Sequence, residues 1–327
     1  MKESSTIRWG IIGAGKIARA FATDFQYLQN AELVAIASRN QKKSIAFAAE
    51  FSIPEAINYE NLFNHPGIDA IYIATPHNFH FEQASLAIRA GKAVLCEKPI
   101  TVNMSEYQQL IALAKQEKVF LMEAMWSYFI PALQVAKNWI NNGLIGDLKL
   151  IQADFCFPSE PTVERLWNPA LAGGALLDIG IYPIAFANYF MNRMPASIRA
   201  SAQLSTTGID ERTGIHLEYG STSANLYTSI VTKGTNTGYL FGTKGYIKLP
   251  SFWRSITIER FNNEDELMET YSDGRTTRGF HFEMQHVTDC LRQGLTESPV
   301  MSFEQSMRLQ EIMGEVRKQI GLRFPFE

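Results

Sequence analysis

The sequence predicts an α/β protein in two parts: a doubly wound domain over residues 1–124 and an α+β domain over 125–327 with a largely antiparallel, open sheet. Three observations support this prediction. Short runs that are apolar on both faces alternate with helical patterns in the first part, as in a parallel sheet covered on two sides. A glycine-rich turn follows the first of these runs. In the second part, strands alternate apolar and polar residues and are joined by glycine-containing turns.

The elements expected in the first domain follow a regular strand–helix rhythm. Pro54 ends one helical pattern and Gly91 is placed to cap another at its C-terminus. We expect strands at 6–13, 31–39, 68–75, 92–98 and 119–124, and helices at 16–28, 42–53, 79–91 and 104–117.

The second domain begins with a helical pattern that ends at Gly143, and period-two strand patterns follow it. A helix that closes the chain is compatible with packing back on the first domain. We expect strands at 147–157, 196–206, 215–220, 223–233 and 237–249, and helices at 131–142, 281–292 and 302–320.

Composition excludes several classes of protein. The 327 residues are 46% hydrophobic and carry a net charge of −3, which gives no basic footprint for nucleic acid or for an anionic membrane. Three widely spaced cysteines do not form a disulfide framework or a zinc motif. The most apolar stretch is interrupted by Asp178, Pro183 and Asn188, so it is a poor membrane span. We expect a cytoplasmic, reduced protein.

The turn "GAGKIA" has the spacing of a dinucleotide-binding turn directly after the first strand. Gly13 allows the tight turn, Gly15 lets the backbone approach a pyrophosphate, and Ala18 lets helix and strand pack closely. The helix start supplies free N–H groups and a positive dipole end, so we also expect contacts from Lys16 and Ile17. The alternative is a glycine turn without a ligand.

The end of the second strand favours NADP over NAD, although NAD stays possible. An NAD site usually carries Asp or Glu here to hold the ribose hydroxyls. This sequence has "ASRN", in which Ser38 and Arg39 offer a hydroxyl and a planar guanidinium to a 2′-phosphate. Lys43 adds positive charge nearby, although lysines at the start of a helix are often simply solvated.

The segment "AVLCEKPIT" ends the fourth strand in an unusual way. Glu97 and Lys98 place opposite charges together, and Pro99 removes a backbone donor. A solvated lysine at a strand end is the simpler interpretation. A cis Lys98–Pro99 bond is a further possibility, against a base rate of about 5% for such bonds.

Polar and aromatic side chains gather at the carboxyl ends of three successive strands, the edge where doubly wound sheets bind ligands. Thr75, His77 and His80 follow the third strand, Lys98 the fourth and Trp126 the fifth. We assign to cofactor contacts Thr75, His77, His80, Glu97 and Lys98. The two histidines lack a third ligand, so we expect no metal.

Four motifs, "RWGIIGAGKIA", "IYIATPHNFH", "AGKAVLCEKPI" and "GGALLDIGIYPI", resemble those of the glucose–fructose oxidoreductase/inositol dehydrogenase (Gfo/Idh/MocA) family. Together with "LMEAMW" and the C-terminal segment, the EKP triplet is similar to the branch of dimeric dihydrodiol dehydrogenases and NADP-dependent D-xylose 1-dehydrogenases. The resemblance implies a Rossmann domain and an open C-terminal sheet that pairs subunits into a homodimer. It also implies hydride transfer between NADP and a hydroxyl carbon of a pyranose sugar or cyclic trans-diol.

Asp178 and Tyr182 are four residues apart in "GGALLDIGIYPI", which places them on one face of an α-helix. Gly173 and Gly174 before them suggest a flexible approach to that helix. The resemblance implies that Tyr182 accepts the hydroxyl proton and that Lys98 lowers its pKa, ordinarily about 10. Which of Lys98 and Tyr182 is the proton acceptor stays open. Asp178 would orient the substrate or Tyr182; a tyrosine packed in the core beside Asp178 is the structural alternative.

Aromatic residues complete the expected substrate pocket, because a ring substrate presents a flat apolar face. The resemblance assigns to this wall Trp126, Phe155, Trp253 and Phe280. Two other functions stay open: a non-catalytic NADP(H)-binding regulator, and a reductase of the same fold with a non-sugar substrate. The choice of substrate depends on loops such as 157–168, and no motif encodes the particular sugar or diol or the direction of the reaction.

Overall fold

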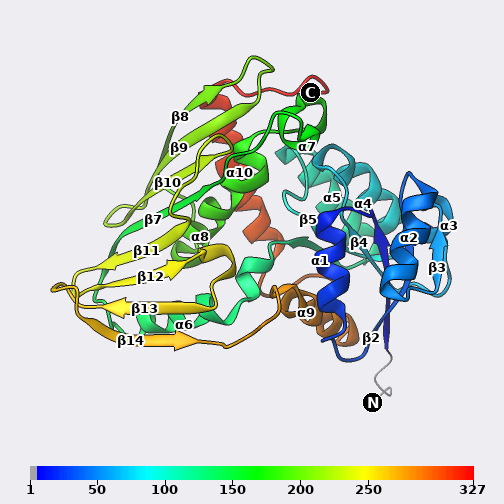
Figure 1. The fold of residues 1–327 in the computed structure, drawn as a ribbon, viewed down its shortest axis with the longest axis horizontal. Coiled ribbons are helices and arrows are strands. Elements are labelled where there is room, and N and C mark those ends of the chain that lie inside the picture. Colours follow the sequence, from blue (N-terminus) through cyan, green and yellow to red (C-terminus); the bar gives the residue numbers. More distant parts are fainter. Residues whose placement is uncertain (1–5) are drawn as a thin grey trace. The chain divides into compact units, whose positions relative to one another are not determined.

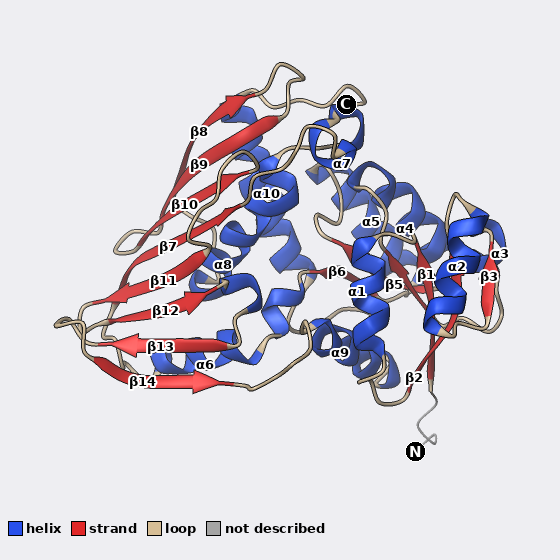
Figure 2. Ribbon diagram, viewed as in Figure 1, coloured by secondary structure: helices blue, strands red, loops and turns tan. Residues whose placement is uncertain are grey.

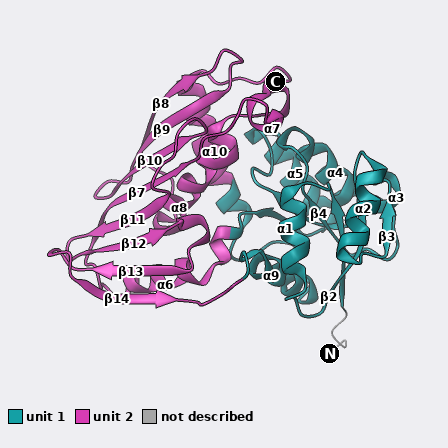
Figure 3. Ribbon diagram, in the orientation of Figure 1, with its two compact units in different colours: residues 1–126, 277–306 teal, residues 127–276, 307–327 magenta. Residues whose placement is uncertain are grey.

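The structure is a computed structural model that describes residues 6–327, and it divides into two compact units (Figure 3). Unit 1 comprises residues up to Trp126 together with Thr277–Ser306, and unit 2 comprises Ser127–Thr276 and Met307–Glu327. The sequence analysis had placed all of 125–327 in one domain. The structure instead groups 277–306 with unit 1 and most of the last helix with unit 2.

Unit 1 contains a six-stranded sheet in the order β3-β2-β1-β4-β5-β6, in which every pair of neighbours is parallel (Figure 1). This confirms the doubly wound domain. The strands are β1 (Ile7–Ile12), β2 (Ala31–Ala37), β3 (Glu55–Ile57), β4 (Ala70–Ile73), β5 (Ala93–Glu97) and β6 (Leu121–Ala124). The helices are α1 (Lys16–Phe25), α2 (Gln41–Phe51), α3 (Tyr59–Phe63), α4 (His80–Arg89), α5 (Met104–Glu117) and α9 (Phe280–Arg292).

Aromatic packing holds α1 against the middle of this sheet. Phe21 of α1 stacks on Tyr72 of β4 with ring centroids 3.8 Å apart, and Trp9 of β1 lies 5.9 Å from Phe21. Strands β4, β5 and β6 are buried along their whole length. The strand order reverses between β1 and β4, and the loops at the carboxyl ends of these strands are where such sheets bind ligands.

Unit 2 contains an eight-stranded sheet in the order β14-β13-β12-β11-β7-β10-β9-β8 (Figure 2). All neighbours are antiparallel except β7 and β10, so the predicted, largely antiparallel sheet is confirmed. The strands are β7 (Leu148–Cys156), β8 (Ser197–Leu204), β9 (Asp210–Glu218), β10 (Ser223–Ser229), β11 (Thr237–Gly242), β12 (Tyr246–Pro250), β13 (Thr257–Phe261) and β14 (Leu267–Ser272).

Helices pack on one face of this sheet, and burial alternates along its inner strands, as in β9 and β10. The helices are α6 (Pro131–Asn141), α7 (Glu164–Trp167), α8 (Ile181–Met191) and α10 (Phe303–Ile320), with a π-helical turn, η4 (Leu176–Gly180), before α8. The helical stretch Pro169–Met191 is long and apolar enough to cross a membrane, but 89% of its most apolar window is buried inside the protein. This burial is typical of a core helix.

Candidate active site

The turn from β1 to α1 has the geometry of a phosphate-binding turn. Gly13 has φ of +104°, and a Cβ at this position would lie 2.6 Å from the carbonyl oxygen of Ala74. Gly15 precedes α1 without a side-chain cap, and a Cβ on it would meet no atom within 4 Å. The helix N-terminus therefore opens onto free space lined by backbone N–H groups, which fits a dinucleotide pyrophosphate.

The end of β2 offers a cation and no carboxylate. Arg39 is exposed, and its guanidinium lies 5.5 Å from the ring centroid of Phe79, in the short helix η1 (His77–Phe79) after β4. Ser38 donates to the carbonyl of Asn40, whose side chain caps α2 at the amide of Lys43. The sequence patterns do not identify Phe79, because its contact with Arg39 is visible only in the structure.

His80 joins the loops after β4 and β5. It is fully buried, with Nε2 2.8 Å from the carbonyl oxygen of Thr75 and Nδ1 2.8 Å from that of Pro99. Burial lowers its pKa, so the neutral ring donates to one carbonyl at a time. His80 thus links the loops after β4 and β5 through their backbone carbonyls. The hydroxyl of Thr75 donates a hydrogen bond to Gln83. Among the described residues, no group of three potential metal ligands gathers.

Lys98 is not a solvated strand end, because only 8% of the residue is exposed. Its bond to Pro99 is cis. Buried acids surround this position: Glu97 accepts a hydrogen bond from the Tyr72 hydroxyl, and Glu123 accepts the amide of Ile100 at 2.9 Å. Burial raises the pKa of Glu123 to about 7, and the positive charge of Lys98 opposes this rise.

Helix α9 brings a distant segment to the same unit. Phe280 stacks on Trp126 with ring centroids 4.4 Å apart, so these two predicted pocket residues do meet. Asp24 of α1 accepts the amides of Gly279 and Phe280 at 3.0 Å each and fixes the start of the helix. One turn later, Glu283 is fully buried, and neither of its oxygens has a hydrogen-bond partner among the residues that the structure describes. Burial together with Glu97 holds its pKa well above the ordinary value.

In unit 2, three predicted residues form a second aromatic cluster. Phe155 of β7 stacks on Trp253 with ring centroids 3.8 Å apart, and its ring lies 5.5 Å from that of Tyr182. Phe157, at 6.3 Å from Phe155, extends the cluster. A flat apolar face therefore lies beside a phenol, an arrangement that suits a hydroxylated ring.

Asp178 lies in the π-helical turn η4, whereas Tyr182 is the second residue of α8. The expected α-helical spacing therefore does not apply between them, because a π-helical turn is wider. Asp178 forms an ion pair with Arg165 of α7, Oδ1 to Nη1 at 2.6 Å. Arg165 was missed because nothing in the sequence links two residues in different segments.

The two glycines before this helix are required by close packing, which corrects the expected flexible approach. A Cβ on Gly173 would lie 2.5 Å from the carbonyl oxygen of Leu166. Gly174 has φ of +118°, and its Cβ would lie 2.3 Å from Asp210 Oδ1. The other oxygen of Asp210 accepts the amide of Leu176 at 2.8 Å, so a buried carboxyl caps the helix start.

The predicted site residues are thus divided between the two units. Unit 1 holds the expected cofactor residues and one aromatic pair: Gly13, Gly15, Lys16, Ile17, Ser38, Arg39, Lys43, Thr75, His77, His80, Glu97, Lys98, Trp126 and Phe280. Unit 2 holds the others: Phe155, Asp178, Tyr182 and Trp253.

Comparisons with known proteins cover nearly the whole chain. Residues 7–125 match the family described as "Oxidoreductase family, NAD-binding Rossmann fold", and residues 133–248 match "GFO/IDH/MocA C-terminal domain". Trans-1,2-dihydrobenzene-1,2-diol dehydrogenase from Mus musculus is 38% identical over 329 residues, 98% of each chain. The Homo sapiens enzyme of that name is 36% identical, also over 98% of each chain.

Two solved structures are similar over most of their length. KijD10, a 3-ketoreductase from Actinomadura kijaniata in complex with NADP and TDP-benzene, has a TM-score of 0.87 at 25% identity, covering 97% of this chain and 98% of that one. Aldose-aldose oxidoreductase from Caulobacter crescentus has a TM-score of 0.87 at 22% identity, covering 96% and 97%, and this likeness shows the fold alone. The chain belongs to the Gfo/Idh/MocA oxidoreductase family and is an NAD(P)-dependent dehydrogenase acting on CH–OH groups.

Proposed function

We propose that the protein transfers hydride between NADP and a ring CH–OH group of a cyclic trans-diol or a pyranose sugar. The observation that carries this proposal is the cluster in unit 2, where the phenol of Tyr182 adjoins the stacked rings of Phe155 and Trp253. A flat ring packs on such aromatic faces and brings an edge hydroxyl to the phenol oxygen. The relatives named dihydrobenzenediol dehydrogenases support the same substrate class.

The chemistry follows from the proposed residues. Oxidation removes a proton from the hydroxyl oxygen and a hydride from the same carbon. NADP supplies the hydride acceptor. Tyr182 takes the proton, and an ammonium group near it would stabilise the phenolate and lower its pKa. We assign that cationic role to Lys98.

Arg39 supports the preference for NADP over NAD. Its exposed guanidinium stands at the end of β2, where "ASRN" provides no carboxylate to repel a 2′-phosphate. Replacing Arg39 by Asp should weaken NADPH binding by ten-fold or more and leave NADH binding equal or stronger. Fluorescence titration with both cofactors measures this, and an unchanged NADPH affinity would contradict the assignment.

The activity is tested by following NADP reduction with trans-1,2-dihydrobenzene-1,2-diol, D-xylose, D-glucose and inositols. We expect turnover with at least one diol or sugar, and loss of at least 10²-fold in kcat for Lys98→Met and Tyr182→Phe with NADPH binding retained. Tyr189→Phe, in the same helix α8, is the matched control and should stay active. No turnover across the panel, or normal rates in both site variants, would overturn the proposal.

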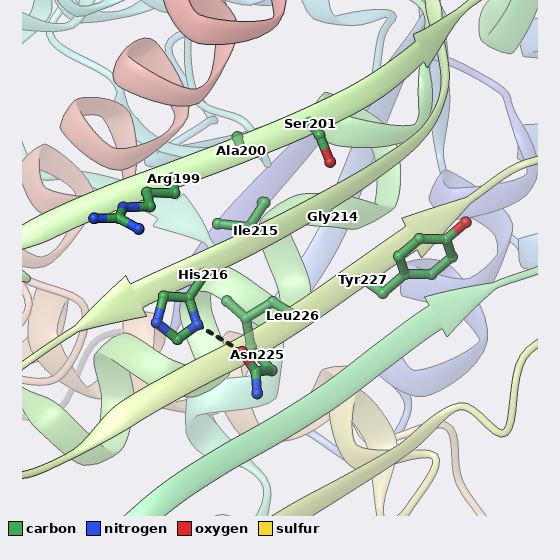
Figure 4. Close-up of a pocket in the computed structure, with 9 residues that line it drawn as sticks. All are labelled: Arg199, Ala200, Ser201, Gly214, Ile215, His216, Asn225, Leu226 and Tyr227. Atoms are coloured by element: carbon green, nitrogen blue, oxygen red, sulfur yellow. Dashed lines mark hydrogen bonds between the residues drawn. The ribbon is translucent and has the colours of Figure 1, made fainter.

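We also propose a homodimer formed through the open face of the sheet in unit 2. This face carries a shallow hollow of about 500 Å³ over β8, β9 and β10, where Arg199, His216, Asn225 and Tyr227 point outward (Figure 4). Farther along the same sheet lie the stacked aromatic residues Tyr239, Phe241, Tyr246 and Phe261. Light scattering should give twice the chain mass, and Phe241→Glu should give a folded monomer. A monomeric parent protein would refute this arrangement.

A further inference from the structure

Trp253, one wall of the proposed substrate pocket, stands in a loop rather than in a strand. The loop 251–256 joins β12 to β13 and contains the short 3₁₀ helix η5 (Phe252–Arg254). Phe252 is buried, which anchors the start of this helix in the core. Trp253 is half-buried, and its ring lies nearly parallel to that of Phe155, with centroids 3.8 Å apart. A 3₁₀ helix of three residues has few hydrogen bonds of its own, so the placement of Trp253 depends on contacts from outside the loop.

Arg275 supplies such contacts from the segment that follows β14. Its Nη2 donates to the carbonyl oxygens of Arg254 at 2.6 Å and Ser255 at 3.0 Å, the two residues after Trp253. Its Nη1 pairs with one carboxylate oxygen of Asp273, whose other oxygen accepts the amide of Arg275 at 3.0 Å. The side chains of Arg275 and Asp273 are only 6% and 8% exposed. The guanidinium therefore joins a buried carboxylate to two carbonyl groups at the end of η5, and all of these residues belong to unit 2.

The planar guanidinium is the group that this arrangement requires. A buried ion pair is by itself weak evidence of a stabilising role, because the desolvation of both charges offsets their attraction. The carboxylate of Asp273 here fixes the guanidinium so that its second nitrogen reaches both carbonyl groups. A lysine would keep the charge, but it has no rigid fork to hold two carbonyl groups while it pairs with Asp273. The arginine thus gives the loop a defined position as well as a counter-charge.

We propose that Arg275, fixed by Asp273, is a positioning residue that holds Trp253 against Phe155 as the wall on which the substrate ring packs. This inference rests on the proposed function, in which the face made by Phe155 and Trp253 adjoins Tyr182. Arg275 acts on the substrate through the backbone of the loop 251–256.

The inference predicts an effect on KM rather than on kcat. A flat aromatic wall contacts the bound substrate and the transition state alike, and loss of such uniform binding raises KM and leaves kcat unchanged. Arg275→Lys keeps the buried charge opposite Asp273 and removes the fork. From the usual strength of an aromatic ring contact, we expect KM for the ring substrate to rise roughly three- to ten-fold in this variant, with kcat nearly unchanged. Arg260→Lys makes the same change in a cross-strand ion pair with Glu269 and is the matched control, which should leave both constants unchanged.

A double-mutant cycle separates positioning from a general structural role. In a Trp253→Ala background, Arg275→Lys should cause no further rise in KM, because two residues that act through one contact are not additive. Near-UV circular dichroism follows the loop without turnover, since a tryptophan loses this signal when its packing loosens. The contribution of Trp253 is the difference between the parent and Trp253→Phe. It should fall clearly in Arg275→Lys and persist in Arg260→Lys. If Arg275→Lys does not fold, Asp273→Asn, which removes the carboxylate that fixes the guanidinium, should change KM and this signal in the same direction.

Ligand binding separates this inference from the proposed function. Saturation-transfer NMR on the enzyme–NADP complex measures the Kd of trans-1,2-dihydrobenzene-1,2-diol without turnover. A Kd that rises in Arg275→Lys, with no oxidation by the parent, would support the positioning role and refute the activity. Turnover with an unchanged KM or an unchanged Trp253 signal in Arg275→Lys, or with effects that multiply in the double variant, would overturn the inference and leave the activity standing. An equal rise in KM in Arg260→Lys would also overturn the inference, and a parent that neither binds nor oxidises any ring substrate would overturn both.

Discussion

Replacing Asp24 by alanine tests how α9 is held in unit 1. Oδ2 of Asp24 accepts the amides of Gly279 and Phe280, 255 and 256 positions away in the sequence. Burial alone would raise the pKa of this carboxyl, but its contacts with His281 and with backbone N–H groups outweigh burial and lower it overall. Asp24 is therefore charged at neutral pH and acts as the cap of a helix that begins with Phe280.

The expected loss follows from the two amides. Each buried N–H left without an acceptor costs about 1–3 kcal/mol, and loss of a helix cap costs typically ~1 kcal/mol. We expect Asp24→Ala to lower the free energy of unfolding by about 2–4 kcal/mol, since the alanine also lets some water reach the amides. At roughly 2–4 °C per kcal/mol, the unfolding midpoint of unit 1 should fall by about 5–15 °C.

Circular dichroism at 222 nm during heating measures this loss. Asp289→Ala in the same helix is the control, because its carboxylate bonds the part-buried side chains of Gln285 and Arg292 and should contribute less than about 1 kcal/mol. Because the folded pKa of Asp24 lies below its unfolded value near 3.9, its stabilisation is present above that value and is lost as the pH falls through the folded pKa. The difference in unfolding midpoint between Asp24→Ala and the parent should stay constant from pH 6 to 8 and become smaller in acid. A loss no larger than that of Asp289→Ala, or a gap that widens in acid, would refute the reasoning.

Three further outcomes are expected. Gly13→Ala should abolish NADPH binding in a fluorescence titration, because the positive φ disfavours alanine and the added Cβ would meet the carbonyl of Ala74; a near-parental Kd would contradict this. Glu283→Gln should gain stability over the parent as the pH rises above the unfolded pKa of about 4.3, because the parent carboxyl has a raised pKa and its stabilisation is lost at higher pH; a constant difference in thermal midpoints would rule this out. Burial raises the pKa of Asp210 to about 7, so the stability of Asp210→Asn relative to the parent should increase between pH 5 and 7 and stay constant above pH 7. Scanning fluorimetry that shows the reverse trend in thermal midpoints would contradict this prediction.

Most elements of unit 1 could be predicted because their signals are local, although the short β3 and α3 were missed. Helix α5 runs from Met104 to Glu117, as its sequence pattern indicates. The Asn103 side chain accepts the amide of Glu106, and the Glu106 carboxylate accepts the amide of Val102, a reciprocal arrangement of the capping-box type. Apolar runs in β4 and β5 are equally informative, because strands buried on both faces consist mainly of apolar residues.

Strand pairing in unit 2 could be predicted only in part. The expected hairpins between consecutive strands are confirmed for β8 and β9, β9 and β10, and β11 and β12, whereas β7 lies between the sequence-distant β10 and β11. The two strands β13 and β14 were missed, because exposed and charged residues such as Glu259 and Glu269 obscure the alternation. Edge strands with polar side chains on their open face carry little of the hydrophobic periodicity on which the predictions depend.

The candidate site shows where sequence reasoning reaches its limit. Lys98 was identified because a charged pair followed by proline is conspicuous at the end of a buried strand, and its burial excludes the solvated alternative. Arg165 left no comparable mark, since an arginine in an exposed loop is common. Gly173 and Gly174, however, do indicate that another chain segment packs closely against them.

Both glycines stand where any Cβ would collide, Gly173 with the carbonyl of Leu166 and Gly174 with Asp210. A pair of glycines before a buried helix can therefore indicate close packing of other chain segments as well as backbone flexibility. Leu166, the residue after Arg165, makes the closest approach to Gly173. A search from the glycine pair for a segment that packs against it would have led to α7, and from α7 to the guanidinium that binds Asp178. The same close packing explains why Asp178 can be held by a helix of only four residues.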